Sequence, residues 1–319
     1  MFSNTIKSLT VGYNPIGKSN VFSSNDCISG RVTLALVKEC KVQSLSIKLK
    51  GKAEVHWTEG FGEDLEIFHS KEKYFSILQF IIKEDQGETI VGQGSHVYPF
   101  TFQIPSQALP SSYSSKYGKI VYSLEAILSR SKRLDSKGRE EFSFIHKVNL
   151  DSDPMLSSPQ HSIIDKKMRL FNSGSVGMDV KIEKTGFHQG ERIKVVGSFQ
   201  NNSTRDVRPK YCFYSKCSYF AAGKRKVETE EILKEEGEAI PPSAAQTVSR
   251  IFTIPPDTNV SILNCDILRV EYRLKIYLDV KYAFDPEVTF PIIILPECEA
   301  PAPEQSILPD SGCEAVSNP

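Results

Sequence analysis

The sequence has 319 residues, with 39 Lys and Arg side chains balanced by 39 Asp and Glu, a hydrophobic fraction of 39% and an aromatic fraction of 10%. This length fits two domains of about 150 residues each, and the apolar content excludes a chain that is disordered throughout. Because the net charge is zero, nothing in the overall balance attracts nucleic acid, and we expect no nucleic-acid partner.

The start of the chain has no pattern typical of secretion. The first 15 residues, MFSNTIKSLTVGYNP, lack a basic stretch followed by a long apolar one, and no later segment approaches 18 continuous apolar residues. The seven cysteines are odd in number and scattered, which favours reduced thiols, and the spacing of Cys212 and Cys217 matches no familiar metal or redox motif. We therefore expect a cytoplasmic protein.

Alternation of apolar and polar residues predicts strands along most of the chain. The expected strands are residues 5–11, 28–37, 42–55, 97–104, 120–128, 142–150, 176–182, 193–199, 207–219, 248–254, 268–280 and 288–295. Turn residues separate them at short intervals, which indicates an all-β sandwich architecture. The charged segment 224–240 is rich in helix formers, so a helix is an alternative there, but its setting among strands favours a solvent-facing β-hairpin.

Two stretches of the chain repeat each other. FTFQIP at 100–105 is followed by IVYSLEAIL, and IFTIPP at 251–256 is followed by LRVEYRLKIYL; an offset of 150 aligns both pairs. The repeat predicts one sandwich present twice. We expect an N-terminal β-sandwich at 1–155, a linker rich in Pro and Ser at 156–172, a C-terminal β-sandwich at 173–296 and a disordered tail at 297–319.

GYNPIGKS at residues 12–19 satisfies the phosphate-binding loop pattern G-x-x-x-x-G-K-S. Such a loop needs a helix after its lysine, whereas turn formers follow Lys18, and Pro15 removes one backbone N–H donor. We interpret the match as accidental and the segment as a connection between strands. No metal-ligand or nucleophile motif occurs elsewhere in the sequence. We therefore expect that the protein is not an enzyme and that it binds no cofactor, metal ion or small-molecule substrate.

The repeated plan resembles a known family. The segments VFSSNDCISGRV, KLKGKAEVHWTE, YPFTFQIP, YGKIVYSLEAIL, GMDVKIEKTGFHQGERIKVVGSFQNNS and SILNCDILRVEYRLKIYLDV are similar to the arrestin domain-containing proteins, the alpha-arrestins. The resemblance implies two arrestin-type immunoglobulin-like β-sandwiches in tandem. It also implies a cytosolic adaptor that binds cytoplasmic regions of membrane receptors or transporters, at the plasma membrane or endosomes, for endocytic sorting. The alternative is a structural coat subunit, similar to the arrestin-shaped component of retromer.

The sequence departs from that family in two places. Members typically carry Pro-Pro-x-Tyr motifs that dock WW domains of ubiquitin ligases, but neither Pro241-Pro242 nor Pro255-Pro256 continues in that way. We therefore expect ubiquitin-ligase machinery to be reached only indirectly. The thioredoxin-binding relative uses a Cys in a region that here reads IPPSAAQTVSR, without Cys, so no thioredoxin partner is expected.

The resemblance also places a cargo-contact loop at the excursion between strands at residues 59–73. Its apolar side chains Phe61, Leu65, Ile67 and Phe68 are the candidate contact residues, with packing against the sandwich as the alternative. Four lysines could meet acidic or phosphorylated cargo tails, with simple solvation of one strand face as the alternative. They are Lys7, Lys48, Lys50 and Lys52.

Overall fold

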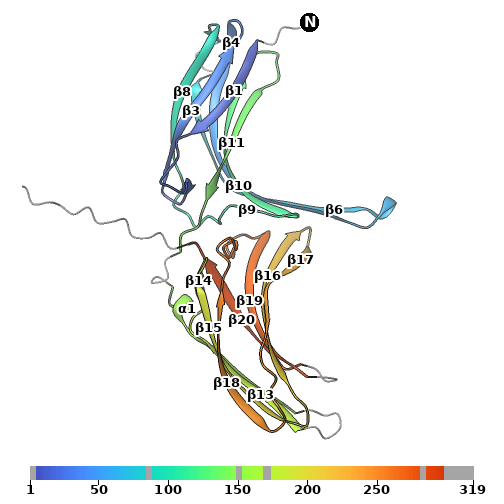
Figure 1. Cartoon of the computed structure of the whole chain (residues 1–319). Coiled ribbons are helices and arrows are strands. Elements are labelled where there is room, and N and C mark those ends of the chain that lie inside the picture. Colours follow the sequence, from blue (N-terminus) through green and yellow to red (C-terminus); the bar gives the residue numbers. More distant parts are fainter. Residues whose placement is uncertain (1–4, 84–87, 149–152, 168–173, 281–284, 298–319) are drawn as a thin grey trace, which may run out of the picture.

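The computed structural model describes residues 5–83, 88–148, 153–167, 174–280 and 285–297. These residues form two β-sandwich domains joined end to end (Figure 1), which confirms the predicted fold class. None of the helices within the described ranges is long and apolar enough to cross a membrane. The predicted tail at 297–319 lies outside the described residues except for Glu297.

The N-terminal domain packs two largely antiparallel sheets over a buried apolar core. One sheet has the order β1 (Ile6–Tyr13), β3 (Cys27–Leu36), β8 (Gly94–Gln103). The other has the order β2 (Val21–Phe22), β11 (Ser136–Phe144), β10 (Gly118–Ser129), β5 (Ser44–Glu59), β6 (Glu66–Ile82), with β9 (Tyr113–Ser114) beside β10. A small ladder joins β4 (Cys40–Val42) to β7 (Thr89–Val91).

The C-terminal domain repeats this arrangement. Its first sheet has the order β12 (Gln160–Lys167), β13 (Gly174–Ile182), β15 (Arg192–Ser203), β18 (Ala244–Thr253). Its second has the order β14 (Gly186–His188), β20 (Glu287–Leu295), β19 (Leu268–Asp279), β16 (Arg208–Ala221), β17 (Lys224–Glu236). In each domain the second sheet begins with a short edge strand that runs parallel to its neighbour. These parallel pairs are β2 with β11 and β14 with β20.

Matching hydrogen bonds confirm the predicted repeat. The buried Tyr122 donates its hydroxyl to the carbonyl of Pro110 at 2.6 Å, and Tyr272 donates to the carbonyl of Asn259 at the same distance. The residue before the proline of each repeated Ile-Pro pair also occupies the same place, because Ile104 and Ile254 are both fully buried. Such buried hydroxyl–carbonyl bonds fix the long connection against its own strand. The two halves therefore share one frame down to individual contacts.

Of two segments that the sequence left less certain, the expected linker differs from the prediction and the charged segment agrees with it. The expected linker at 156–172 contains a strand, β12, which pairs with β13 from Gln160 to Lys167 because its side chains alternate between half-buried and exposed. Before it, α1 (Pro154–Ser157) begins at an Asp153 side chain that accepts from the N–H of Met155. The segment 224–236 is a strand, as predicted, and forms the second arm of a hairpin with β16.

The phosphate-loop match is a connection between strands, as expected. Gly12 lies within β1, a turn covers residues 17–19, and β2 follows at Val21 with no helix after Ser19. Asn20 adopts a left-handed backbone, and its side chain accepts a hydrogen bond from the N–H of Ile16. This geometry lacks the helix N-terminus on which phosphate binding at such loops depends.

Candidate interaction surface on the β5–β6 hairpin

The longest hairpin among the described residues is formed by β5 and β6, paired from Leu45 with Ile82 to Glu59 with Glu66. Its turn, residues 60–65, includes the short 3-10 helix η1 (Gly62–Asp64). Figure 1 shows this hairpin extending sideways from the junction of the two domains. We call its far end, residues 60–67, the hairpin tip.

A glycine and a bulge shape the hairpin where it leaves the core. The register between β5 and β6 shifts between Gly51 and Lys52. A Cβ atom at Gly51 would lie 2.7 Å from ring carbons of both Phe75 and Tyr122, so only glycine lets these rings close over the strand. A bulge increases the local twist of a strand pair, which helps to direct the hairpin away from the sandwich.

The inner face of the hairpin is held by the C-terminal domain. The carboxylate of Glu72, on β6, accepts hydrogen bonds from the N–H of Asp266 at 2.9 Å and from the thiol of Cys265 at 3.4 Å. Gly118, which pairs with Val55, sits so close to Leu268 and Tyr219 that a Cβ there would meet both. These contacts fix the base of the hairpin between the domains.

An aromatic cluster completes this domain junction. The ring of Tyr117 packs edge-on against Tyr219 at 5.7 Å, and the ammonium of Lys226 lies over the Tyr117 ring at 4.8 Å. Tyr219 donates its hydroxyl to Ser115 at 3.0 Å. Because every contact here joins the two domains, the hairpin and the C-terminal domain are positioned together.

Burial makes the cysteines of this region poor nucleophiles. Loss of solvent raises the pKa of the Cys217 thiol and of the Cys212 thiol, and it raises the pKa of Cys265 to about 11. Among the described residues, no group of three or more His, Cys, Asp or Glu side chains is arranged to hold a metal ion.

The outer face of the same sheet carries most of its charge. Alternate residues of β5 point outward, and Lys48, Lys50 and Lys52 are half-buried there. The neighbouring strands add exposed cations to this face. They are Lys71 and Lys73 on β6, Lys119 on β10, and Lys137 and Arg139 on β11. We call these eight side chains and the strands between them the basic face.

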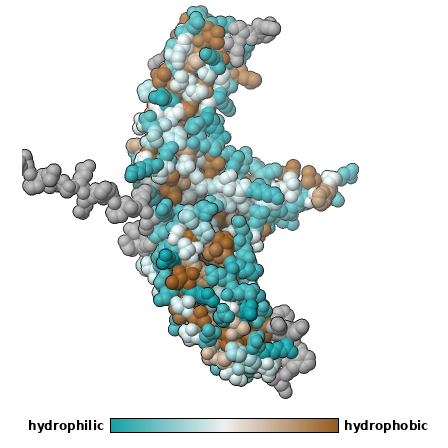
Figure 2. Space-filling view, in the orientation of Figure 1, coloured by the Kyte–Doolittle hydropathy of each residue, from teal (hydrophilic) through white to brown (hydrophobic). Residues whose placement is uncertain are grey.

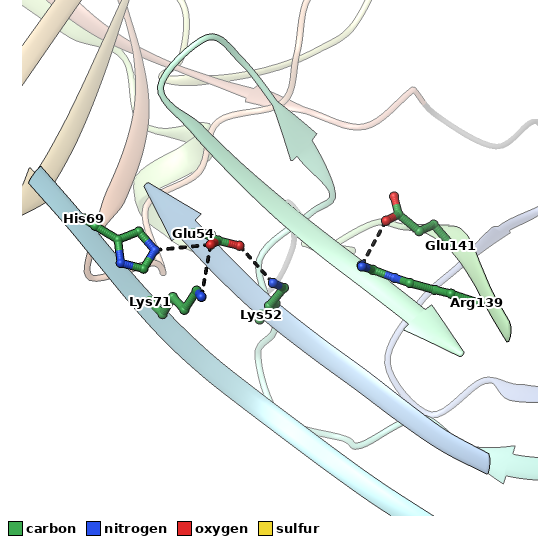
Figure 3. Close-up of polar contacts among 6 residues, drawn as sticks. All are labelled: Lys52, Glu54, His69, Lys71, Arg139 and Glu141. Carbon is green, nitrogen blue, oxygen red and sulfur yellow. Dashed lines mark hydrogen bonds and ion pairs between the residues drawn. The ribbon is translucent and has the colours of Figure 1, made fainter. Parts of the chain in front are cut away.

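One carboxylate sits among these cations. Glu54 contacts Lys52 at 2.8 Å, and His69 and Lys71 at 3.2 Å each (Figure 3). The hydrogen bond from Lys52 is the main cause that lowers the pKa of Glu54 to about 2. Arg139 pairs with Glu141 on β11 at 2.9 Å, and Lys50 pairs with Glu125. The carboxylates of Glu54, Glu125 and Glu141 offset only part of the positive charge of the eight cations.

The hairpin tip brings together three of the four predicted contact residues. Phe61 is 94% exposed, Ile67 64% and Leu65 50%. The space-filling view shows hydrophobic surface at the end of the hairpin (Figure 2). Isolated exposed apolar residues are common, but three at the end of one projection form a patch with no contact to the core.

The fourth residue differs from the others. Phe68 is only 6% exposed and stacks on Trp57 at 5.1 Å between ring centres, so for this residue packing is the correct interpretation. The predicted loop context is also wrong for residues 66–73, which lie in β6. Side chains of β6 alternate between the two faces of the sheet. Phe68 therefore points to the inner, packed face, and Ile67 points to the outer, exposed one.

Sequence reasoning named the β5 lysines but missed their neighbours on β6, β10 and β11. The strands alternate charge in FHSKEKY and SKGREEF, which was a usable signal. However, only the cross-strand register shows that these lysines share one face with β5. Lys7, the remaining predicted residue, lies on β1 in the opposite sheet and does not join this face.

This fold of two tandem sandwiches with a hairpin at their junction defines an arrestin-type protein. Residues 11–151 match the family described as "Arrestin (or S-antigen), N-terminal domain", and residues 172–297 match the corresponding C-terminal domain. The chain therefore belongs to the arrestin domain-containing, or alpha-arrestin, family.

Several known proteins are similar to this chain over most of its length. Mouse "Arrestin domain-containing protein 4" is 30% identical over 300 residues, which cover 91% of this chain and 72% of the relative. Its human counterpart is 29% identical, with 71% of the relative covered. Rat "Thioredoxin-interacting protein" is also 29% identical, with 91% of this chain and 74% of the relative covered.

Proposed function

We propose that this protein is a cytosolic adaptor that binds cytoplasmic regions of membrane receptors or transporters and takes part in their endocytic sorting. Family membership supports an arrestin-like adaptor. The single observation that carries the site is the hairpin tip, where Phe61, Leu65 and Ile67 are exposed at the end of a projection whose base is fixed between the domains. A rigid base with an apolar end suits contact with another protein, because little ordering is needed on binding.

The adaptor is proposed to reach ubiquitin-ligase machinery through another protein. The 319 residues contain no Pro-Pro-x-Tyr motif. Pro241 and Pro242 are exposed but continue with Ser and Ala, which leaves no tyrosine for a WW-domain groove. An isolated WW domain is therefore not expected to bind this chain directly.

A thioredoxin partner is not part of the proposal. A relative carries the name "Thioredoxin-interacting protein", but the raised pKa values of Cys212, Cys217 and Cys265 disfavour disulfide exchange at these thiols. This supports the expectation drawn from the missing Cys at 240–250.

The proposal is tested by affinity capture from detergent extracts of cell membranes with the full chain. The test variant carries Phe61→Ser, Leu65→Ser and Ile67→Ser. The control carries Leu134→Ser, Ile90→Ser and Ile251→Ser, which remove apolar side chains that are 57 to 92% exposed elsewhere on the surface. We expect the wild type and the control to recover transmembrane proteins and the tip variant to lose them.

Other outcomes would overturn the proposal. Equal recovery by the tip variant would mean that the tip is not the cargo site. Recovery of one stoichiometric soluble complex, with no transmembrane protein, would instead indicate a structural coat subunit of arrestin fold.

A further inference from the structure

The basic face is a continuous array set by the strand register. Across β10, β5 and β6, Lys119 lies beside Glu54, which lies beside Lys71. One row further along, Lys52 lies beside Lys73. Toward the other end, Lys48 lies beside Glu125, which lies beside Arg139. Directly opposed side chains on one face are only about 5 Å apart, so the cations form one field.

The field is strongly unbalanced. The eight Lys and Arg side chains face three carboxylates, Glu54, Glu125 and Glu141, an excess of five positive charges, although the chain as a whole has no net charge. Within the described ranges, four of these lysines form no ion pair. They are Lys48, Lys73, Lys119 and Lys137. A partner can contact them without breaking an existing pair.

The shape of the field favours a broad partner over a single peptide. Four adjacent strands span about 14 Å at about 4.8 Å between strands, and eight residues along β10 span about 26 Å. An extended peptide covers a width of only about 5 Å. The opposite face of these strands is closed, because it packs on the core and on Asp266 and Cys265 of the C-terminal domain.

Exposed apolar side chains border the same field. Ile67 opposes Thr58 on the outer face, two residues before His69 in β6. Phe61 and Leu65 lie in the turn that precedes β6. At the other end of β6, Leu78 and Phe80 are also exposed and lie beside Lys48 and Ser46. Lysines with apolar residues at their edges are the side chains that enter the headgroup region of a bilayer.

We propose that the basic face binds the surface of a membrane that contains anionic lipids, which holds the hairpin tip close to the membrane proteins that it contacts. The inference goes beyond the proposed function because it names a lipid surface as a second partner, independent of any cargo protein. The long lysine side chains reach the lipid phosphates while the sheet lies along the membrane. Each lysine near an anionic leaflet contributes about 1 kcal/mol, or roughly five-fold in binding.

The test is sedimentation of the full chain with vesicles of phosphatidylcholine alone or mixed with phosphatidylserine. The test variant carries Lys73→Gln, Lys119→Gln and Lys137→Gln. These side chains are exposed and unpaired, so the folded state should retain its stability, which urea unfolding checks. The control carries Lys38→Gln, Lys181→Gln and Lys194→Gln, which remove the same charge from other exposed positions.

We expect the wild type and the control to bind the mixed vesicles, and the test variant to bind roughly 100-fold more weakly. Binding should also disappear at about 1 M salt, where the Debye length is about 3 Å. Equal binding by the test and control variants would overturn the proposal, and so would equal binding to both kinds of vesicle.

A soluble, multiply phosphorylated peptide serves as a competitor in the same assay. Binding of this peptide through the three lysines, without any binding to vesicles, would assign the face to an acidic peptide and overturn the membrane proposal. The vesicles contain no protein, so their result is independent of the capture experiment at the hairpin tip. Failure of one proposal is therefore distinguishable from failure of the other.

Discussion

The two domains carry hairpins at equivalent positions in the sheet, but the turns of these hairpins differ. In the N-terminal domain, β5 pairs with β10 and then with β6; in the C-terminal domain, β16 pairs with β19 and then with β17. The β16–β17 hairpin closes through Ala222 and Gly223, both with positive φ, a tight turn with no apolar tip. The β5–β6 hairpin instead has a longer turn that presents Phe61. The strand order that the two domains share stabilises both, whereas the longer β5–β6 turn creates a candidate interaction site in the N-terminal domain alone.

The charges of the two hairpins differ in the same way. On the β16–β17 side, Lys210 pairs with Glu236 at 3.0 Å and with Asp279 at 2.8 Å, and Lys234 pairs with Glu231 at 3.2 Å. On the β5–β6 side, the unpaired lysines of the basic face remain available. Neutralised surface pairs contribute little stability, so the contrast between the hairpins concerns binding more than folding.

The largest expected effect on the difference between the two hairpins comes from removing the aromatic packing inside the β5–β6 hairpin. Val55, which pairs with Gly118, corresponds to Tyr219, which pairs with Leu268, so Trp57 and Ala221 lie two residues beyond equivalent positions. Trp57→Ala removes a ring that is almost fully buried and stacked on Phe68. We expect the free energy of unfolding to fall by about 3–5 kcal/mol in urea titrations. A loss below about 1 kcal/mol would show that the hairpin does not depend on this packing.

A residue exchange sharpens the comparison at the bulge. Gly51 opposes Tyr122 in one domain, and Ser215 opposes Tyr272 in the other. Gly51→Ser places a side chain within 2.7 Å of two rings and should cost about 1–3 kcal/mol in the free energy of unfolding. The reverse change, Ser215→Gly, should cost only about 0.5–1 kcal/mol. Equal costs would argue against a special role for Gly51.

The smallest effect concerns acid stability of the basic face. Because cations lower the pKa of Glu54 to about 2 in the folded protein, the unfolded chain takes up a proton first as the pH falls below about 4.5. Folded-state stability should therefore decrease between about pH 4.5 and 2, and Glu54→Gln should decrease less steeply over that window. Urea midpoints measured across this range test it, and parallel curves for the two proteins would contradict it.

The sequence predicted the frame better than the surface. Period-two alternation and the repeated Ile-Pro pairs at 104 and 254 gave the strands and the duplication, since burial of one strand face leaves a local pattern. The contact of Glu72 with Asp266 joins residues 194 apart, and no local pattern reports such a contact. The face of the sheet to which Phe68 points, and the assembly of the basic face, likewise depend on the register between paired strands. The sequence of a single strand does not reveal that register.

The central claim is that the β5–β6 hairpin tip, and not exposed apolar surface in general, contacts membrane proteins. The most direct measurement places a photoreactive phenylalanine analogue at Phe61 or at Leu134, which are similarly exposed, and identifies the adducts formed in cells. We predict adducts with transmembrane proteins from position 61 and none from position 134. Equal yields from both positions, or no transmembrane adduct from position 61, would contradict the claim.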